Sequence, residues 1–298
     1  MLSICIPIYN TSIPTLIHEL YKQCKVNEIP FEIICLDDAS SLFKEENKII
    51  SNYGEVSYAE LPQNIGRSAI RNRLAEQANY EYLLFLDCDV AILTTDFIRK
   101  YITTIHSNAS VVVGGRTYIQ NQFTEETKLH FHYGNSREVI PANKRALNPY
   151  SAFVTGNFLI RKDIFSSIKF LSSLTEYGHE DTLFGIELKK SAIPIIHISN
   201  PVAHIGLERN EIFIQKQLTA IKNLSTLIHQ NYDMSSISIY HFYLNLKKYH
   251  LVKFFIWSFA PIQPFVKRIL KSGQTNWLTL FDFLRLFELA VHLKNQNN

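Results

Sequence analysis

Two acidic residues, Asp87 and Asp89, follow an apolar run at residues 82–86 and are separated by one residue. Carboxylate oxygens placed in this way can bind Mg²⁺ or Mn²⁺, and such a cation would neutralise a diphosphate. They can equally bind a ribose or form a polar loop. A second acidic pair, Asp37 and Asp38, ends another apolar run, where a turn or a helix cap is the alternative to a binding site.

Two arginines, Arg67 and Arg71, lie four residues apart at the start of a helical pattern. Residues at this spacing project from one face of a helix. Paired guanidinium groups at a helix start suit the recognition of a phosphate or a base. A solvated helix face is the alternative.

Glu180 and Asp181 open a later helical pattern. Acidic residues in a first helical turn are ordinary partners of the helix dipole, but one of them could also serve as the general base for a hydroxyl nucleophile. His204 lies in an apolar run, where a structural histidine is the usual interpretation. It becomes a candidate ligand only if it faces Asp89.

Alternating apolar runs and helical patterns must position these residues. The expected strands are residues 2–8, 31–36, 56–61, 82–86, 111–113, 158–160 and 193–198. Continuous apolar strands that alternate with helices predict a parallel sheet covered on both faces, with ligands beyond the carboxyl ends of the strands. After residue 209 only helical patterns remain. We therefore expect an α/β domain at residues 1–235 and a helical region at residues 236–298.

Composition and termini exclude several classes of protein. A chain of 298 residues with 46% hydrophobic and 19% charged residues is not disordered, and a net charge of +3 does not indicate a nucleic-acid partner. The N-terminus has no basic region or cleavage site of a signal peptide, which predicts a cytoplasmic location. The four cysteines are then expected to be free thiols, of which Cys5 and Cys35 are buried.

The charge is unevenly distributed along the chain. Residues 240–298 contain eight Lys and Arg against two Asp and Glu, a net charge of +6, so the rest of the chain carries −3. This segment is also rich in Phe and Leu. Basic and aromatic residues together suit a peripheral segment on the anionic inner face of the cytoplasmic membrane. Packed helices with a solvated basic face, or a homodimer interface, are the alternatives.

Five segments occur together in an order that resembles the family-2 glycosyltransferases of the GT-A fold. They are SICIPIYN (residues 3–10), IICLDDAS (33–40), NIGRSAIRN (64–72), LLFLDCDV (83–90) and GHEDTLF (178–184). Two more segments, HYGNSRE (132–138) and NPYSAFVTGNFLI (148–160), look like those of bacterial members that build polysaccharides or lipopolysaccharides. The resemblance implies the GT-A (nucleotide-diphospho-sugar transferase) fold, with a mostly parallel central sheet and a C-terminal helical region.

The resemblance also implies a role for individual residues. The nucleotide site would comprise Pro7, Tyr9, Asn10, Asp38, Arg67, Arg71, Asn72 and Asp87. Asp38 would bind the base, typically uracil, and Asp89 would ligate Mn²⁺ or Mg²⁺ together with Asp87 and His204. Asp181 matches the catalytic base, and Glu180 would orient the acceptor. Gly156, Asn157 and His179 would lie on the side of the sugar and the acceptor.

The implied activity is metal-dependent, inverting transfer of a hexose from a nucleotide-diphosphate donor, typically a UDP-sugar. The acceptor would be a hydroxyl of a glycan or of a lipid-linked molecule in cell-surface polysaccharide synthesis. The metal would stabilise the departing diphosphate, and Asp181 would remove the proton of the attacking hydroxyl. Since an ordinary carboxyl has a pKa near ~4, we expect Asp181 to be ionised at neutral pH without special tuning.

Two other functions use a similar α/β sheet. A nucleotidyltransferase usually carries a glycine-rich phosphate loop near its N-terminus, and residues 1–30 contain no glycine. A non-catalytic module that binds sugar nucleotides would not need both Asp89 and Asp181. The sequence therefore favours an active glycosyltransferase over both alternatives.

Overall fold

The computed structural model describes residues 1–172, 177–273 and 278–295. Its contacts divide the chain into two compact units. The first, here called the sheet unit, comprises residues 1–119, 138–175 and 180–206, and the second, the helical unit, comprises residues 120–137, 176–179 and 207–298. The contacts thus assign residues 207–235 to the helical unit, whereas the sequence placed them with the first domain.

A seven-stranded sheet forms the centre of the sheet unit, in the order β3-β2-β1-β4-β8-β6-β9. Its strands are β1 (Leu2–Ile8), β2 (Phe31–Asp37), β3 (Val56–Glu60), β4 (Tyr82–Leu86), β6 (Val111–Val113), β8 (Asn157–Arg161) and β9 (Ile195–His197). The strands β1 to β4 are parallel to one another, as is β9 to β6, while β8 is antiparallel to both β4 and β6. The predicted, mostly parallel sheet is confirmed.

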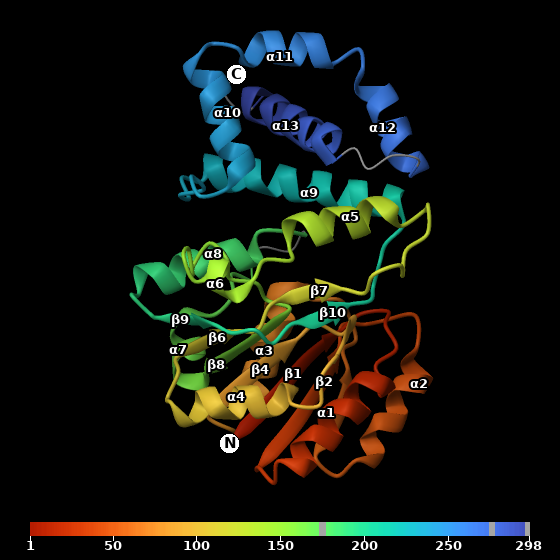
Figure 1. Ribbon diagram of the computed structural model, residues 1–298, viewed down its shortest axis with the longest axis vertical. Coiled ribbons are helices and arrows are strands. Elements are labelled where there is room, and N and C mark those ends of the chain that lie inside the picture. Colours follow the sequence, from red (N-terminus) through yellow and green to blue (C-terminus); the bar gives the residue numbers. More distant parts are fainter. Residues whose placement is uncertain (173–176, 274–277, 296–298) are drawn as a thin grey trace. The chain divides into compact units, whose positions relative to one another are not determined.

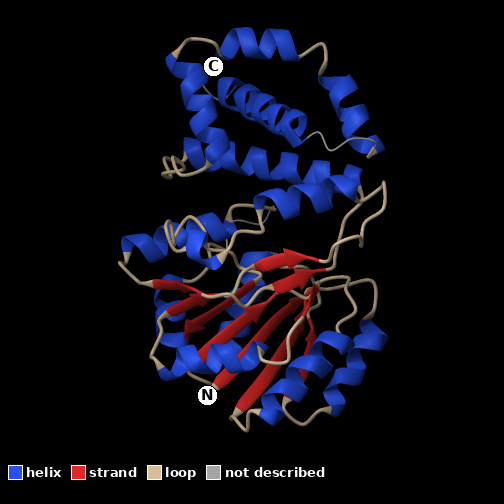
Figure 2. Ribbon diagram, viewed as in Figure 1, coloured by secondary structure: helices blue, strands red, loops and turns tan. Residues whose placement is uncertain are grey.

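Helices cover both faces of this sheet (Figures 1 and 2). One hydrophobic core joins the sheet to α1 (Pro14–Val26) and α4 (Phe97–His106), and another joins it to α3 (Arg67–Gln77), α7 (Lys162–Ile168) and α8 (Glu180–Lys190). The shorter helices are α2 (Lys44–Lys48), α6 (Ala142–Arg145) and the 3-10 turn η1 (Ile49–Asn52).

The two cores follow from the alternation of side chains along each strand. In β1, Ile4 and Ile6 point into the core under α1 and α4, while Cys5 points into the other core as a buried free thiol. Much of the second core is aromatic, and the rings of Phe85 and Phe158 stack with centroids 4.9 Å apart. Strands that are apolar on both sides are therefore buried on both sides.

A small second sheet lies beside the first and has the order β5-β10-β7. Its strands are β5 (Val90–Ala91), β10 (Val202–His204) and β7 (Arg116–Tyr118). Val90 in β5 pairs with His204 in β10, and His204 also pairs with Tyr118 in β7. This sheet brings three segments that are distant in the sequence to the end of β4.

The helical unit contains α5 (Lys128–Arg137), α9 (Asn210–His229), α10 (Ser238–Lys248), α11 (Val252–Phe259), α12 (Gln263–Ser272) and α13 (Leu278–Asn295). The helix α13 packs against each of the others, which explains why residues 207–235 belong with the C-terminal helices. At the end of α12, Gly273 has a φ of 68°, and a Cβ there would overlap the backbone oxygen of Glu125. None of the described helices is long and apolar enough to span a membrane.

Candidate active site

The loops that follow the parallel strands β1 and β2 are joined by hydrogen bonds at one edge of the sheet. The Oδ1 atom of Asn10, after β1, accepts hydrogen bonds from the backbone of Ser41 (2.8 Å) and Leu42 (3.1 Å), after β2. Tyr9 is 54% exposed beside this junction, and Pro7 lies within β1. The Tyr9 ring is therefore free to stack on a planar ligand, whereas Asn10 joins two loops.

Asp38 is buried and holds the loop that precedes α3. Its two carboxylate oxygens accept hydrogen bonds from the backbone N–H groups of Ile65 (2.7 Å) and Gly66 (3.0 Å). Burial raises the pKa of Asp38, and these two hydrogen bonds oppose the increase. Gly66 has a φ of 83°, a conformation that favours glycine. Asp38 thus positions the start of the helix that carries Arg67 and Arg71.

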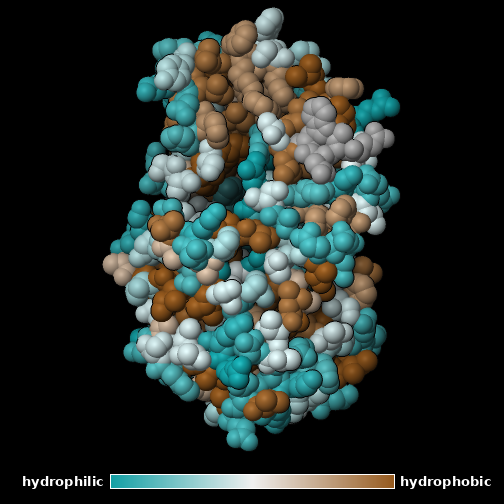
Figure 3. Space-filling model, in the orientation of Figure 1, coloured by the Kyte–Doolittle hydropathy of each residue, from teal (hydrophilic) through white to brown (hydrophobic). Residues whose placement is uncertain are grey.

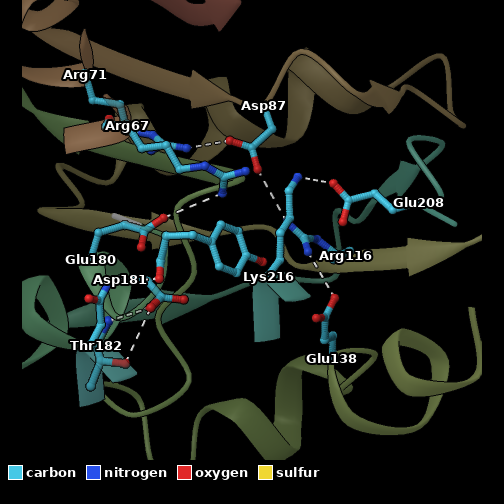
Figure 4. A network of polar contacts seen from close by, with 12 residues as sticks. Arg67, Arg71, Asp87, Arg116, Glu138, Glu180, Asp181, Thr182, Glu208 and Lys216 are labelled. Atoms are coloured by element: carbon cyan, nitrogen blue, oxygen red, sulfur yellow. Dashed lines mark hydrogen bonds and ion pairs between the residues drawn. The ribbon is translucent and has the colours of Figure 1, made fainter. Parts of the chain in front are cut away.

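The carboxylate of Asp87 lies between two guanidinium groups (Figure 4). Arg71 Nη2 is 2.6 Å from Oδ1, and Arg116 Nη2 is 3.4 Å from Oδ2. Arg116 also donates to Glu138 Oε2 at 3.0 Å, and the hydroxyl of Tyr118 donates to the same oxygen at 2.5 Å. Burial opposes the charge of Arg116, but Glu138, Tyr118 and Asp87 raise the pKa of its guanidinium. The Asp87 carboxylate therefore forms ion pairs with Arg71 and Arg116 in this structure.

Gly156 is required by the close approach around Asp87. A Cβ at this position would lie 2.6 Å from Asp87 Oδ2 and 2.8 Å from Arg116 Nη2. Its carbonyl oxygen also accepts the backbone N–H of Asp87 at 3.2 Å. The glycine that the resemblance places beside the sugar thus lets β8 begin directly against this ion pair.

Asp89 and His204 face each other, which is the condition under which His204 is a candidate ligand. Their Oδ1 and Nδ1 atoms are 3.5 Å apart. Burial raises the pKa of Asp89, but His204, Arg116 and Arg67 together lower it below its ordinary value. Gly206 is packed against Asp89, because a Cβ there would lie 2.9 Å from the Asp89 side chain.

This pair fits a divalent cation. Asp89 Oδ1 is buried and accepts no hydrogen bond from the described residues. Carboxylate and imidazole together suit Mn²⁺, and Mg²⁺ is commonly held by one or two carboxylates with the phosphates of a substrate. No group of three or more His, Cys, Asp and Glu forms a complete metal site in the described part of the chain. The remaining ligands would have to come from the donor and from water.

Glu180 and Asp181 begin α8 in the same unit. Glu180 Oε1 is 3.7 Å from Arg67 Nη1, and Asp181 Oδ1 accepts the backbone N–H of Thr182 at 2.7 Å. Burial, followed by the charge of Glu180, raises the pKa of Asp181 to about 6. The expectation of an ordinary carboxyl pKa at Asp181 is therefore wrong, because a desolvated carboxylate beside a second one is harder to ionise.

Two further residues that the resemblance places in the site form hydrogen bonds that stabilise the fold. Asn157 donates to the carbonyl oxygens of Gly115 (2.9 Å) and Asn200 (2.8 Å) and accepts the hydroxyl of Tyr101 (2.6 Å). Asn72 is buried and exchanges two hydrogen bonds with the backbone of Phe170. Their side chains join elements of the sheet unit, and a direct contact with substrate stays a prediction.

His179 precedes α8 and belongs by contacts to the helical unit, with a left-handed backbone φ of 71°. Gly178 before it is packed against Ala220, where a Cβ would lie 2.6 Å from the Ala220 Cβ. The geometry around His179 is therefore that of a constrained turn at the entrance to α8. Its role towards an acceptor stays a prediction.

The sequence reasoning missed Arg116 and the role of Glu138. The charge of Arg116 lowers the pKa of both Asp89 and Asp181, so this guanidinium acts on the candidate ligand and on the candidate base. A lone arginine in a three-residue strand gives no periodic signal. The only hint was its position directly after Gly114 and Gly115, at the end of an apolar run.

Comparisons with known proteins identify the family and the fold of the chain. Residues 3–169 match the family described as Glycosyl transferase family 2. Chondroitin synthase of Pasteurella multocida (strain Pm70) is 25% identical over 226 residues, which cover 63% of this chain and 23% of that protein. The chain thus spans about a quarter of the length of this curated relative.

Two solved structures show the same fold. S. aureus TarS 1–349 in complex with UDP has a TM-score of 0.52 and 18% identity, covering 99% of this chain and 91% of that one. The mannosyltransferase PcManGT from Pyrobaculum calidifontis, in complex with GDP-Man and Mn²⁺, has a TM-score of 0.60 and 12% identity, covering 99% and 86%. At these identities the likeness concerns the fold alone.

Proposed function

The chain belongs to glycosyltransferase family 2, and from this premise we propose that it is a metal-dependent, inverting hexosyltransferase with a UDP-sugar donor. The acceptor is a hydroxyl of a glycan or of a lipid-linked molecule, in the synthesis of a cell-surface polysaccharide. UDP and UDP-GlcNAc are bound by TarS, and GDP-Man by PcManGT, which supports a nucleotide-sugar donor. The glycosyltransferase domain is proposed to span residues 1–235.

One observation carries the proposal. Arg116 lies close enough to Asp89 and to Asp181 for its charge to act on both, and it contacts Asp87 directly. A candidate metal ligand, a carboxylate with a raised pKa and two guanidinium groups therefore share one edge of the sheet. The same edge can therefore stabilise the negative charge that develops on a leaving diphosphate and accept the proton of the acceptor hydroxyl.

Each residue has a distinct task in this proposal. Asp89 and His204 would hold Mn²⁺ or Mg²⁺, which would supply Lewis acidity towards the diphosphate. Arg71 and Arg116 stabilise the charge that the diphosphate gains as it leaves, while Asp87 keeps both guanidinium groups in place. Asp181 accepts the proton of the acceptor hydroxyl, and Glu180, held towards Arg67, orients that hydroxyl. Attack from the face opposite the leaving group inverts the anomeric carbon.

The binding of the nucleotide is proposed to use the neighbouring loops. The exposed ring of Tyr9 stacks on the base, and Asp38 fixes the loop that borders the base. Asn10 and Pro7 form part of the nucleotide site, while the acceptor approaches from the side of His179. Residues 236–298 make peripheral contact with the inner face of the cytoplasmic membrane, where a lipid-linked acceptor is found.

The test is a panel of UDP-glucose, UDP-galactose and their N-acetyl forms, each incubated with Mn²⁺, with Mg²⁺ and with EDTA. We expect metal-dependent release of UDP from one of these donors, and an Asp89→Asn variant that loses both turnover and the response to metal. Formation of UTP and a sugar 1-phosphate from a UDP-sugar and added inorganic diphosphate would instead favour a nucleotidyltransferase. The absence of UDP release from every donor, with and without candidate acceptors, would favour a binding module and contradict the proposal.

A further inference from the structure

The outer face of α11 exposes two large aromatic rings. Phe255 and Phe259 belong to the core of the helical unit, where the ring of Phe259 lies 5.2 Å from that of Phe287. Phe254 and Trp257, three residues apart, occupy the opposite stripe and are 62% and 74% exposed. Their ring centroids are 6.0 Å apart. Neighbouring exposed rings of this size mark an interaction surface rather than scattered surface residues.

Exposed apolar side chains continue along the sequence on both sides of α11. Tyr249 (65%) and Leu251 (45%) precede the helix, and Phe265 (65%) lies in the first turns of α12. We call these residues the aromatic face: Tyr249, Leu251, Phe254, Trp257 and Phe265. Figure 3 shows brown and tan side chains gathered over the C-terminal helices.

Basic residues without acidic partners lie beside the aromatic face in the sequence, on α10, α11 and α12. Among the described residues, no carboxylate pairs with Lys247, Lys248, Lys253 or Arg268. The acids of α13 are used elsewhere, since Asp282 pairs with Arg137 and Glu288 with Lys267. Arg268 lies one turn from Phe265 on α12, and Lys253 lies one turn before Trp257 on α11. The surface is therefore both apolar and cationic.

We propose that the aromatic face inserts into the interfacial region of an anionic bilayer, with Lys247, Lys248, Lys253 and Arg268 on the lipid phosphates. Exposed Trp and Phe beside Lys and Arg are the composition of interfacial helices. A symmetric dimer through this face would bring each set of four cations close to its copy, which like-charge repulsion opposes. The membrane contact of the proposed function is thereby assigned to the aromatic face. Insertion into the bilayer does not depend on sugar transfer.

Vesicle co-sedimentation of the full chain tests this inference. Vesicles contain either equal parts of phosphatidylglycerol and phosphatidylcholine, or phosphatidylcholine alone. We expect binding to the anionic vesicles that weakens with salt. The double variant Phe254→Ala/Trp257→Ala should lower the partition coefficient about tenfold or more through lost apolar burial. Replacing the four cations by Gln should lower it about a hundredfold on anionic vesicles.

The matched control is Val26→Ala/Leu147→Ala, which removes two apolar side chains of the sheet unit that are 75% and 78% exposed. This variant should bind vesicles as the unaltered chain does. Failure of the full chain to bind anionic vesicles, or undiminished binding by the Phe254→Ala/Trp257→Ala variant, overturns the inference. An Asp181→Asn chain should also bind unchanged, so loss of transfer alone overturns the proposed function and leaves the membrane inference standing.

Discussion

At the scale of the residue, the most informative group is Asp181. Its pKa is raised to about 6 by burial and by the charge of Glu180, close to the range in which a general base works efficiently. A base acts in its deprotonated form. The raised pKa therefore favours proton removal from a hydroxyl while leaving most of Asp181 ionised at neutral pH.

This environment predicts an acid limb in the pH profile of transfer. Below about pH 6, protonation of Asp181 should lower kcat in proportion to the proton concentration, and above it kcat should level off. The measurement is kcat at saturating donor, acceptor and metal across pH 4.5–8, roughly two units around the raised pKa. A limb centred near the ordinary carboxyl pKa would contradict the assigned environment.

Replacing Arg116 tests whether transfer needs its guanidinium group or only its positive charge. Arg116→Lys keeps the charge but cannot bridge Asp87 and Glu138, because an ammonium group lacks the planar fork of a guanidinium. We expect kcat to fall about a hundredfold. Arg116→Ala should in addition lower the free energy of unfolding by about 1–3 kcal/mol, because the half-buried carboxylates of Asp87 and Glu138 each lose one charged hydrogen-bond partner.

The control for Arg116 is Arg73→Lys, an exposed position on α3. It should leave kcat unchanged and alter the free energy of unfolding by less than about 0.5 kcal/mol. Unfolding is followed by urea titration and kcat by release of UDP. Full activity of Arg116→Lys would remove the guanidinium from the mechanism.

At the scale of the element, the sequence predicts helices and strands that have a periodic apolar pattern. It misses short strands that form only by pairing with residues distant in the sequence. The long strands and α3 follow from continuous apolar runs and from helical spacing. In contrast, β7 and β10 have three residues each and exist because Arg116 pairs with Val202 and Tyr118 with His204 across more than eighty residues. Such short strands carry no signal of their own, so the position of Arg116 in the site could not be predicted.

The backbone of Gly156 lies close to the Asp87–Arg116 ion pair where β4 and β8 meet, and this predicts the effect of adding a side chain there. Gly156→Ala would place a methyl group 2.6 Å from Asp87 Oδ2 and 2.8 Å from Arg116 Nη2, so the ion pair must shift. We expect at least about tenfold weaker binding of UDP in the presence of Mn²⁺ and a loss of about 1–3 kcal/mol in stability. Calorimetric titration and thermal unfolding measure the two effects.

Gly54→Ala is the matched control, because no atom lies within 4 Å of a Cβ at that position. It should leave both quantities unchanged. Wild-type affinity in Gly156→Ala would show that the arrangement of Asp87 and Arg116 does not matter for the nucleotide.

At the scale of the whole molecule, the order of five motifs was sufficient to predict the family and the GT-A fold, both of which are confirmed. The division into units was harder to predict. The helical pattern of α9 is visible in the sequence, but its packing partner α13 lies about fifty residues later, and only the contacts reveal it. Likewise, the sequence could place Asp181 at a helix start but not the burial that raises its pKa.

The uneven charge also acquires an interpretation at this scale. The acidic side chains of the sheet unit, such as Asp87 and Asp89, meet guanidinium and imidazole groups in the candidate site. Part of the excess of basic residues in the C-terminal helices has no such counterpart among the described residues and accompanies an exposed aromatic face. Chemistry and the proposed membrane contact thus use separate parts of the chain.

The central claim is that Asp181 is the base of a sugar transfer, and the variant Asp181→Asn tests it most directly. Transfer from the active UDP-sugar and donor affinity by calorimetry should be measured together, with Asp163→Asn, an exposed carboxylate on α7, as the control. We expect Asp181→Asn to lose about 10²–10⁴-fold in kcat while its donor affinity is unchanged, and Asp163→Asn to behave as the unaltered chain. Retained turnover in Asp181→Asn, or a loss of donor affinity that accounts for the lost turnover, would contradict the account.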